Sequence, residues 1–310
     1  MPKLPLTLAC WDYDRTRPLI DGRVQTDDIV LDVRLVRPQQ AFQAMLRDKN
    51  FHAGEMSLAT YVAMKARGAC PFVAIPAMLS KIFRHSCIYI RRDAGIRVPG
   101  DLKGKRAGAT QFASTGVVFM KGMLQHEFGV LQSDMSWSIG GLHAPVEPPA
   151  APLAAPPGVR LDHIDAGQTL EGMLKAGEIE VLFTNHFPSL FEQGWPGIGR
   201  LFPDYKSVEQ DYFRRTRIFP IMHTVVIRED VHREHPWVAR NLYRAFCQAR
   251  DLAVNGLYDT DALRLSLPWL IQHIEETRDA LGMDFFAYGL EDRKSTRLNS
   301  SHVALSRMPS

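Results

Sequence analysis

The chain has 310 residues, of which 45% are hydrophobic and 23% are charged. These proportions are typical of globular proteins and exclude a disordered or fibrous chain. The length exceeds what a single hydrophobic core usually serves, and it favours two lobes of about 100–150 residues each.

The formal net charge of +3 depends on the end of the sequence. Asp292–His302 matches the translation of a common sequencing-library adapter, so we interpret residues 292–310 as a non-native tail. This tail carries four basic side chains against one acidic side chain, which leaves the rest of the chain neutral. The charge therefore gives no indication of a nucleic-acid partner, and the tail is excluded from the fold prediction.

Hydropathy and cysteine usage indicate the compartment. The mean hydropathy is −0.15 and no apolar run is long enough to span a membrane, so no membrane association is predicted. The opening residues 1–10 are too short and too interrupted by proline for a signal peptide, which favours a cytoplasmic location. The cysteines are scattered and predict reduced thiols rather than disulfides or a zinc site: Cys10, Cys70, Cys87 and Cys247.

The first part of the chain alternates apolar runs with helical spacing and predicts an open α/β sheet. The expected strands are Leu4–Ala9, Ile29–Leu35, Phe51–Leu58, Phe72–Pro76 and His85–Ile90, and the expected helices are Pro38–Arg47 and Thr60–Arg67.

A second α/β unit follows, and a Pro-, Ala- and Gly-rich loop is expected over Gly140–Pro157. Strands are expected at Ala107–Ala109, Val159–Ile164, Ile179–Phe183 and Ile218–Ile227, and helices after Thr110–Gly116 and at Leu170–Ala176, Pro236–Val254 and Leu263–Leu281.

Several stretches resemble the 4,5-dihydroxyphthalate decarboxylase family over about residues 3–291. They are Leu6–Thr16, Gly54–Leu58, Phe83–Ser86 and, as the most specific of them, Phe219–Val226. The resemblance implies a type II periplasmic-binding-protein-like α/β fold with two lobes and a ligand cleft between them. Lobe 1 would comprise residues 1–88 and 226–291, lobe 2 would comprise residues 89–225, and the strands His85–Ile90 and Ile218–Ile227 would cross between them.

The resemblance also implies an activity, the decarboxylation of 4,5-dihydroxyphthalate or a close analogue in aromatic degradation. A small-anion solute-binding protein of an ABC transporter, without catalysis, is the alternative on the same fold, and a cofactor-precursor enzyme is a third. Trp11 stands where the family suggests glycine, and Thr184–Phe187 replaces a stretch richer in Arg and Pro, so the substrate could differ from the namesake.

Decarboxylation of a hydroxylated ring needs an acid beside the carbon that loses CO2 and a group that stabilises charge at the hydroxyl. His223, in the polar centre of an apolar strand, is the first candidate for proton transfer; a buried histidine satisfied by a carbonyl is the structural alternative. His85 is a second acid–base candidate. Glu55 could accept a hydroxyl proton or hold His85 in one tautomer.

A cation should hold the remaining carboxylate, and Arg84 is the candidate because arginine binds carboxylates bidentately. Asp12 and Ser57 end strands where substrate could bind, although Ser57 is also placed to cap a helix. Backbone amides and hydroxyls at a helix N-terminus could bind an anion at Gln111, Ser114 and Thr115.

The expected partner is a small aromatic carboxylate substrate, and a homo-oligomer is left open. No cofactor is predicted and no metal-binding residues are assigned, although a divalent metal is left open. The spacing of His232 and His235 is interpreted as a helix start on the surface rather than a metal site.

Overall fold

The computed structural model describes residues 2–47, 50–147, 155–263 and 265–290. They divide into two compact units, unit 1 with residues 2–81 and 221–290, and unit 2 with residues 82–220. The expected tail at 292–310 lies outside the described residues. The units change at 81/82 and 220/221, whereas the sequence places the lobe boundaries at 88/89 and 225/226. The difference arises because β4 continues to Lys81 and β11 begins at Ile221.

Unit 1 contains a five-stranded sheet in the order β2-β1-β3-β11-β4. β1, β2 and β3 are parallel, and β11 is antiparallel to both β3 and β4. Its elements are β1 (Leu4–Cys10), α1 (Arg17–Ile20), β2 (Ile29–Leu35), α2 (Pro38–Arg47), β3 (Ala53–Ser57), α3 (Leu58–Ala66), β4 (Phe72–Lys81), β11 (Ile221–Arg228), α8 (Glu229–Glu234), α9 (Trp237–Asn255) and α10 (Leu270–Leu281).

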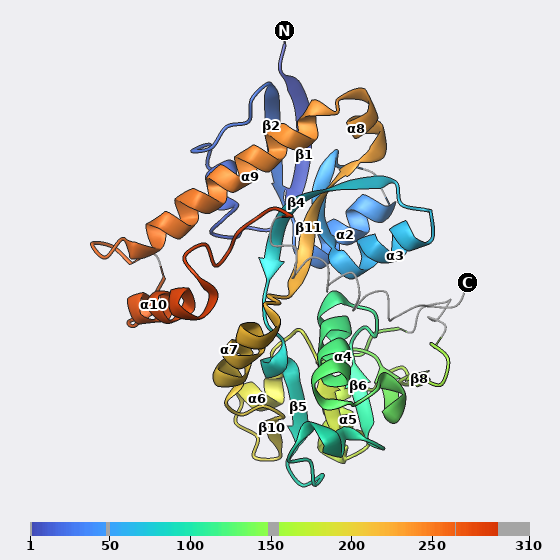
Figure 1. Ribbon diagram of the computed structural model, residues 1–310. Coiled ribbons are helices and arrows are strands. Elements are labelled where there is room, and N and C mark those ends of the chain that lie inside the picture. The colour runs from blue at the N-terminus through green and yellow to red at the C-terminus, as the bar shows by residue number, and fades with distance from the viewer. Residues whose placement is uncertain (1, 48–49, 148–154, 264, 291–310) are drawn as a thin grey trace. The chain divides into compact units, whose positions relative to one another are not determined.

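The sheet of unit 1 is covered on both faces, with α9 on one side and α2 and α3 on the other (Figure 1). Successive residues of β11 show this alternation. Val225 and Ile227 belong to the same buried apolar cluster as Phe246 of α9, whereas Val226 belongs to a separate cluster with Met45 of α2. Burial on both faces explains why the central strands read as continuous apolar runs.

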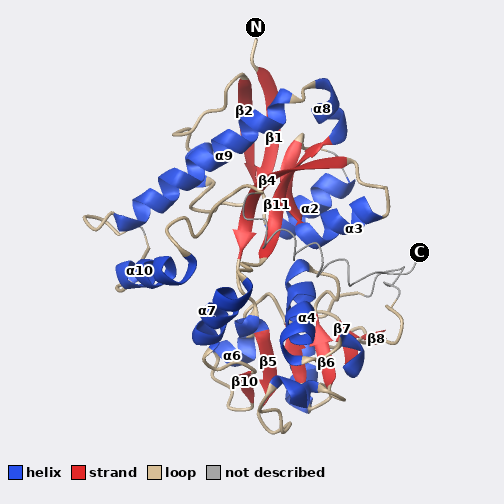
Figure 2. Ribbon diagram, in the orientation of Figure 1, coloured by secondary structure: helices blue, strands red, loops and turns tan. Residues whose placement is uncertain are grey.

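Unit 2 contains a six-stranded sheet in the order β10-β5-β9-β6-β7-β8, flanked by helices (Figure 2). Its elements are β5 (Ile88–Arg91), β6 (Arg106–Ala109), α4 (Thr115–Phe128), β7 (Ser136–Ile139), β8 (Arg160–His163), α5 (Leu170–Ala176), β9 (Val181–Phe183), α6 (Ser189–Glu192), β10 (Ile198–Arg200) and α7 (Tyr205–Thr216). The core between sheet and helices includes Leu170, Leu174, Ile179 and Leu182. The described residues thus confirm the predicted α/β class.

Several expected elements have different bounds. The strand expected at Phe72–Pro76 continues to Lys81, and the helix expected at Leu263–Leu281 is α10, which begins at Leu270. The strand expected at His85–Ile90 is a 3₁₀ turn at His85–Cys87 followed by β5, because Arg84 already departs from extended backbone. The pair His232 and His235 spans the last turn of α8 and the residues directly before α9, which begins at Trp237.

Lys121 of α4 is buried in unit 2, and this burial lowers its pKa to about 7. Its Nζ donates to the main-chain oxygen of Phe112 at 3.0 Å and lies 3.2 Å from the centre of that ring. An unfolded lysine keeps its proton to about pH 10.4. Unfolding therefore takes up a proton between these values, so the Lys121 contribution to the free energy of unfolding rises with pH across this window.

We expect Lys121→Met to raise the free energy of unfolding at pH 6.5 by about 2 kcal/mol and to have little effect at pH 10.5. Urea denaturation at the two pH values measures this difference. Lys103→Met, which removes an exposed ammonium, is the matched control and should be neutral at both. A K121M protein that is less stable than the parent at pH 6.5 would contradict this assignment.

Candidate active site

The register of β3 and β11 brings Glu55 and His223 together. Glu55 lies opposite Val225, and His223 lies opposite Ser57. Side chains two residues apart along a strand share one face, so Glu55 and His223 are diagonal neighbours across two antiparallel strands. The contact joins residues that are 168 positions apart in the sequence.

In this Glu55–His223 dyad, one imidazole nitrogen of His223 is hydrogen-bonded and the other is open to a ligand. Nδ1 of His223 lies 2.7 Å from Oε1 of Glu55, so it donates its proton to this carboxylate. The Glu55 side chain is fully buried, whereas 20% of the His223 side chain is exposed. Among the described residues, no protein group hydrogen-bonds Nε2 of His223. This nitrogen is therefore available to a substrate, while the ring is held edge-on by Phe42 with a centroid distance of 4.9 Å.

Tyr13 is a second donor to the same carboxylate, with its hydroxyl 2.7 Å from Oε1 of Glu55. Burial and the Glu55 charge raise the pKa of Tyr13, so the hydroxyl keeps its proton. The same two causes raise the pKa of Cys10 to about 12. The guanidinium carbon of Arg15 lies 4.1 Å from the centre of the Tyr13 ring and fixes its position.

The second oxygen of Glu55, Oε2, is buried and has no hydrogen-bond partner among the described residues. A buried carboxylate that accepts two hydrogen bonds on one oxygen keeps unused acceptor capacity on the other. The arrangement can stabilise positive charge on the imidazole of His223 and hold it in one tautomer. It is suited to delivering a proton from Nε2.

Of the other unit 1 candidates, Ser57 accepts a hydrogen bond from the amide of Thr60 at 3.4 Å and caps α3, as the structural alternative predicts. Asp12 forms an ion pair with Arg17, which occupies one of its oxygens. Trp11 follows β1 and is half-buried.

The two unit 2 candidates lie directly before β5, and Nδ1 of His85 has no hydrogen-bond partner among the described residues. His85 is buried between the rings of Phe202 and Tyr212, and its Nδ1 lies 3.6 Å from Oε1 of Glu209. Within unit 1, the imidazole that contacts Glu55 is His223, and within unit 2 the carboxylate that faces His85 is Glu209. The hypothesis that Glu55 holds His85 in one tautomer stays a prediction.

Arg84 is half-buried, and its Nη1 lies 3.6 Å from Sγ of Cys87. This contact places the guanidinium beside the residues that lead into β5.

The structure brings the three helix-start candidates to the beginning of α4. Ser114 is the N-cap and accepts from the amide of Val117 at 3.4 Å, Thr115 is buried, and Gln111 is exposed. Asn185, which follows β9, donates to Oγ of Ser114 at 3.3 Å.

Gly116 of α4 explains how Asn185 approaches the helix so closely. A Cβ at this position would lie 1.9 Å from Oδ1 of Asn185, so only glycine leaves room for that amide. Sequence reasoning assigned no role to Asn185 or to Tyr13, although both lie in stretches it singled out.

Across residues 2–290, apart from the masked gaps, no group of three or more His, Cys, Asp or Glu side chains is arranged to hold a metal ion. Within the same part of the chain, no helix combines the length and apolar character that crossing a bilayer requires.

Two known proteins are similar to this chain in sequence. The chain is 36% identical over 292 residues to 4,5-dihydroxyphthalate decarboxylase of Comamonas testosteroni, covering 94% of this chain and 88% of that protein. It is 35% identical over 214 residues to 4,5-dihydroxyphthalate decarboxylase of Pseudomonas putida, covering 69% and 83%. No family model matches the chain.

Among solved structures, the periplasmic aliphatic sulphonate binding protein of Escherichia coli aligns with a TM-score of 0.50 at 12% identity, covering 98% of this chain and 86% of that one. This likeness shows the fold alone, and it agrees with the periplasmic-binding-protein-like architecture predicted from the sequence. The two decarboxylases carry the relationship at the level of sequence, and the chain belongs to the 4,5-dihydroxyphthalate decarboxylase family.

Proposed function

We propose that this protein is a carboxy-lyase that removes one carboxylate from 4,5-dihydroxyphthalate or a close analogue, as a step of aromatic degradation. Two relatives that carry this activity in their names support the reaction and the substrate class. The observation that carries the proposal within the structure is the Glu55–His223 contact, with Nε2 of His223 open to a ligand.

The Glu55–His223 dyad can carry out this reaction with every proton and electron pair accounted for. Nε2 of His223 donates its proton to the ring carbon that bears the carboxylate, while a hydroxyl para to that carbon supplies electron density. The carbon–carbon bond to the carboxylate then breaks, its electrons restore the aromatic ring, and CO2 leaves. The product is 3,4-dihydroxybenzoate.

Glu55 supports this transfer without touching the ring. Its negative charge stabilises the protonated imidazole before transfer, and its bond to Nδ1 leaves Nε2 as the nitrogen that can meet the substrate. Because the His223 side chain is partly exposed, solvent can return the proton after each turnover. The roles of His85, Arg84, Asp12, Ser57, Gln111, Ser114 and Thr115 stay predictions of the sequence.

CO2 release and binding calorimetry on the full 310-residue chain, both with 4,5-dihydroxyphthalate, test the proposal. We expect catalytic CO2 release with one equivalent of 3,4-dihydroxybenzoate. Tight binding without CO2 would reject the enzyme and favour the solute-binding alternative that the fold also accommodates. The cytoplasmic location stays a prediction. A homo-oligomer and a divalent metal stay open alternatives.

A further inference from the structure

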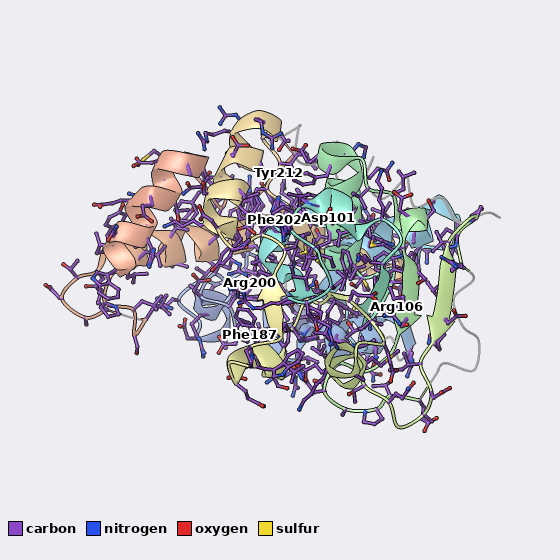
Figure 3. The ribbon with its side chains drawn as sticks, turned by 90° about the horizontal axis from the view of Figure 1, so that it is seen from below. Asp101, Arg106, Phe187, Arg200, Phe202 and Tyr212 are labelled. Atoms are coloured by element: carbon purple, nitrogen blue, oxygen red, sulfur yellow. The ribbon has the colours of Figure 1, made fainter. Side chains whose placement is uncertain are left out.

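Arg200, at the end of β10 in unit 2, lies among four aromatic rings. Figure 3 labels Arg200 and one of these rings, Phe187. The distances from its guanidinium carbon to the ring centres are 4.5 Å for Phe191, 4.9 Å for Tyr205, 5.7 Å for Tyr89 and 5.8 Å for Phe187. A guanidinium stacked on aromatic faces is fixed in its plane, which lowers the entropy lost when it binds a planar anion.

No carboxylate among the described residues lies within ion-pair distance of Arg200. Its Nε donates to the main-chain oxygen of Ser86 at 3.2 Å, a neutral acceptor. Arg106, which begins β6 in the same sheet, is by contrast neutralised by Glu180. Arg200 is half-buried, and a half-buried charge without an acidic partner retains its capacity to bind an anion.

The strand directions place this cation at a ligand-binding edge of the unit 2 sheet. β10 and β9 are both antiparallel to β5, so they run in the same direction, and β6 is parallel to β9. Arg200 ends β10, and Phe187 follows the end of β9. In open α/β sheets, ligands bind outside the carboxyl ends of the strands.

Phe187 adds an apolar surface beside this charge. Half of this side chain is exposed (51%), although its ring also packs edge-to-face on Phe191. An exposed aromatic ring next to an unpaired guanidinium matches a ligand that has an anionic group on an aromatic ring. A simple inorganic anion would use the charge but not the ring.

We propose that Arg200 binds the carboxylate of an aromatic acid bidentately and that Phe187 packs against the ring of that acid. The choice of a benzene dicarboxylate as ligand class rests on the proposed function. The site itself rests on the contacts of Arg200, and it needs no turnover to be observed.

Calorimetry with phthalate tests the site, because phthalate has both carboxylates but lacks the hydroxyls that promote decarboxylation. Cyclohexane-1,2-dicarboxylate has the same charges without the aromatic ring. We expect Arg200→Gln to weaken phthalate binding at least ~10-fold and Arg200→Lys to weaken it less, because lysine keeps the charge but not the planar fork. Arg214→Gln, which removes an exposed charge of α7, is the matched control and should bind like the parent.

Phe187→Leu separates the ring contact from the charge. We expect it to reduce the preference for phthalate over cyclohexane-1,2-dicarboxylate at least ~3-fold while leaving thermal stability unchanged, because the side chain is half exposed. If R200Q does not fold, the phthalate binding of R200K and F187L is compared with that of the parent protein instead. The proposal is overturned if phthalate does not bind the parent protein, or if folded R200Q and F187L both bind it like R214Q.

The outcomes also separate this site from the proposed function. Phthalate binding that depends on Arg200, in a protein that releases no CO2 from 4,5-dihydroxyphthalate, would retain the site and reject the reaction. CO2 release that is unchanged in R200Q, without phthalate binding, would retain the reaction and reject the site.

Discussion

Replacing His223 with alanine is expected to reduce kcat at least ~100-fold and to change substrate affinity less than ~10-fold. The reason is that Nε2 is the open atom of the dyad and is assigned to proton transfer, which affects the transition state more than the bound substrate. CO2 release under saturating substrate gives kcat, and calorimetry on the inactive variant gives the dissociation constant.

His223→Asn controls for the structural effect of losing the ring. H223A leaves the buried carboxylate of Glu55 with one donor fewer, which destabilises proteins by about 1–3 kcal/mol. An asparagine amide can replace Nδ1 as that donor but offers nothing in place of Nε2. We expect H223N to be folded and as inactive as H223A. Equal losses of binding and rate in both variants would reject proton transfer by His223.

Replacing Glu55 with glutamine is expected to lower kcat ~100-fold or more, with His223 still present. The amide keeps the shape of the side chain but removes the charge that stabilises the protonated imidazole, and it can present N–H to Nδ1 in place of an acceptor. Because Glu55 acts through His223, the double variant E55Q/H223A should be no slower than H223A alone.

Tyr13→Phe is the matched control for E55Q, because it removes the other donor on Oε1 and leaves the Glu55–His223 contact. We expect a loss in kcat below ~10-fold, as for a group that helps to position a carboxylate. Additive losses in E55Q and H223A, or a Y13F loss as large as that of E55Q, would mean that Glu55 does not work through His223.

Elements with strong periodicity were predictable from the sequence, whereas polar and short elements were not. The bounds predicted for Ile29–Leu35, Pro38–Arg47 and Leu170–Ala176 agree with β2, α2 and α5. α7 was not predicted because its twelve residues bury only Tyr212 and Phe213, which gives little apolar periodicity.

The candidate site was predictable as a set of residue types but not as a set of contacts. His223 and Glu55 were identified separately, since their pairing depends on the register between β3 and β11. Arg200 ends a strand of three residues, and the rings around it come from separate segments, so no local pattern points to it.

The most direct test of proton transfer by His223 is the reaction of 4,5-dihydroxyphthalate in D2O followed by proton NMR, with the parent protein and H223N side by side. Because the proton that replaces CO2 comes from an exchangeable nitrogen, we expect 3,4-dihydroxybenzoate with deuterium at C6 only. Its rate of formation should fall at least ~100-fold in H223N. Two results would contradict proton transfer by His223: substrate that binds the parent protein but does not react, or equal rates for the two proteins.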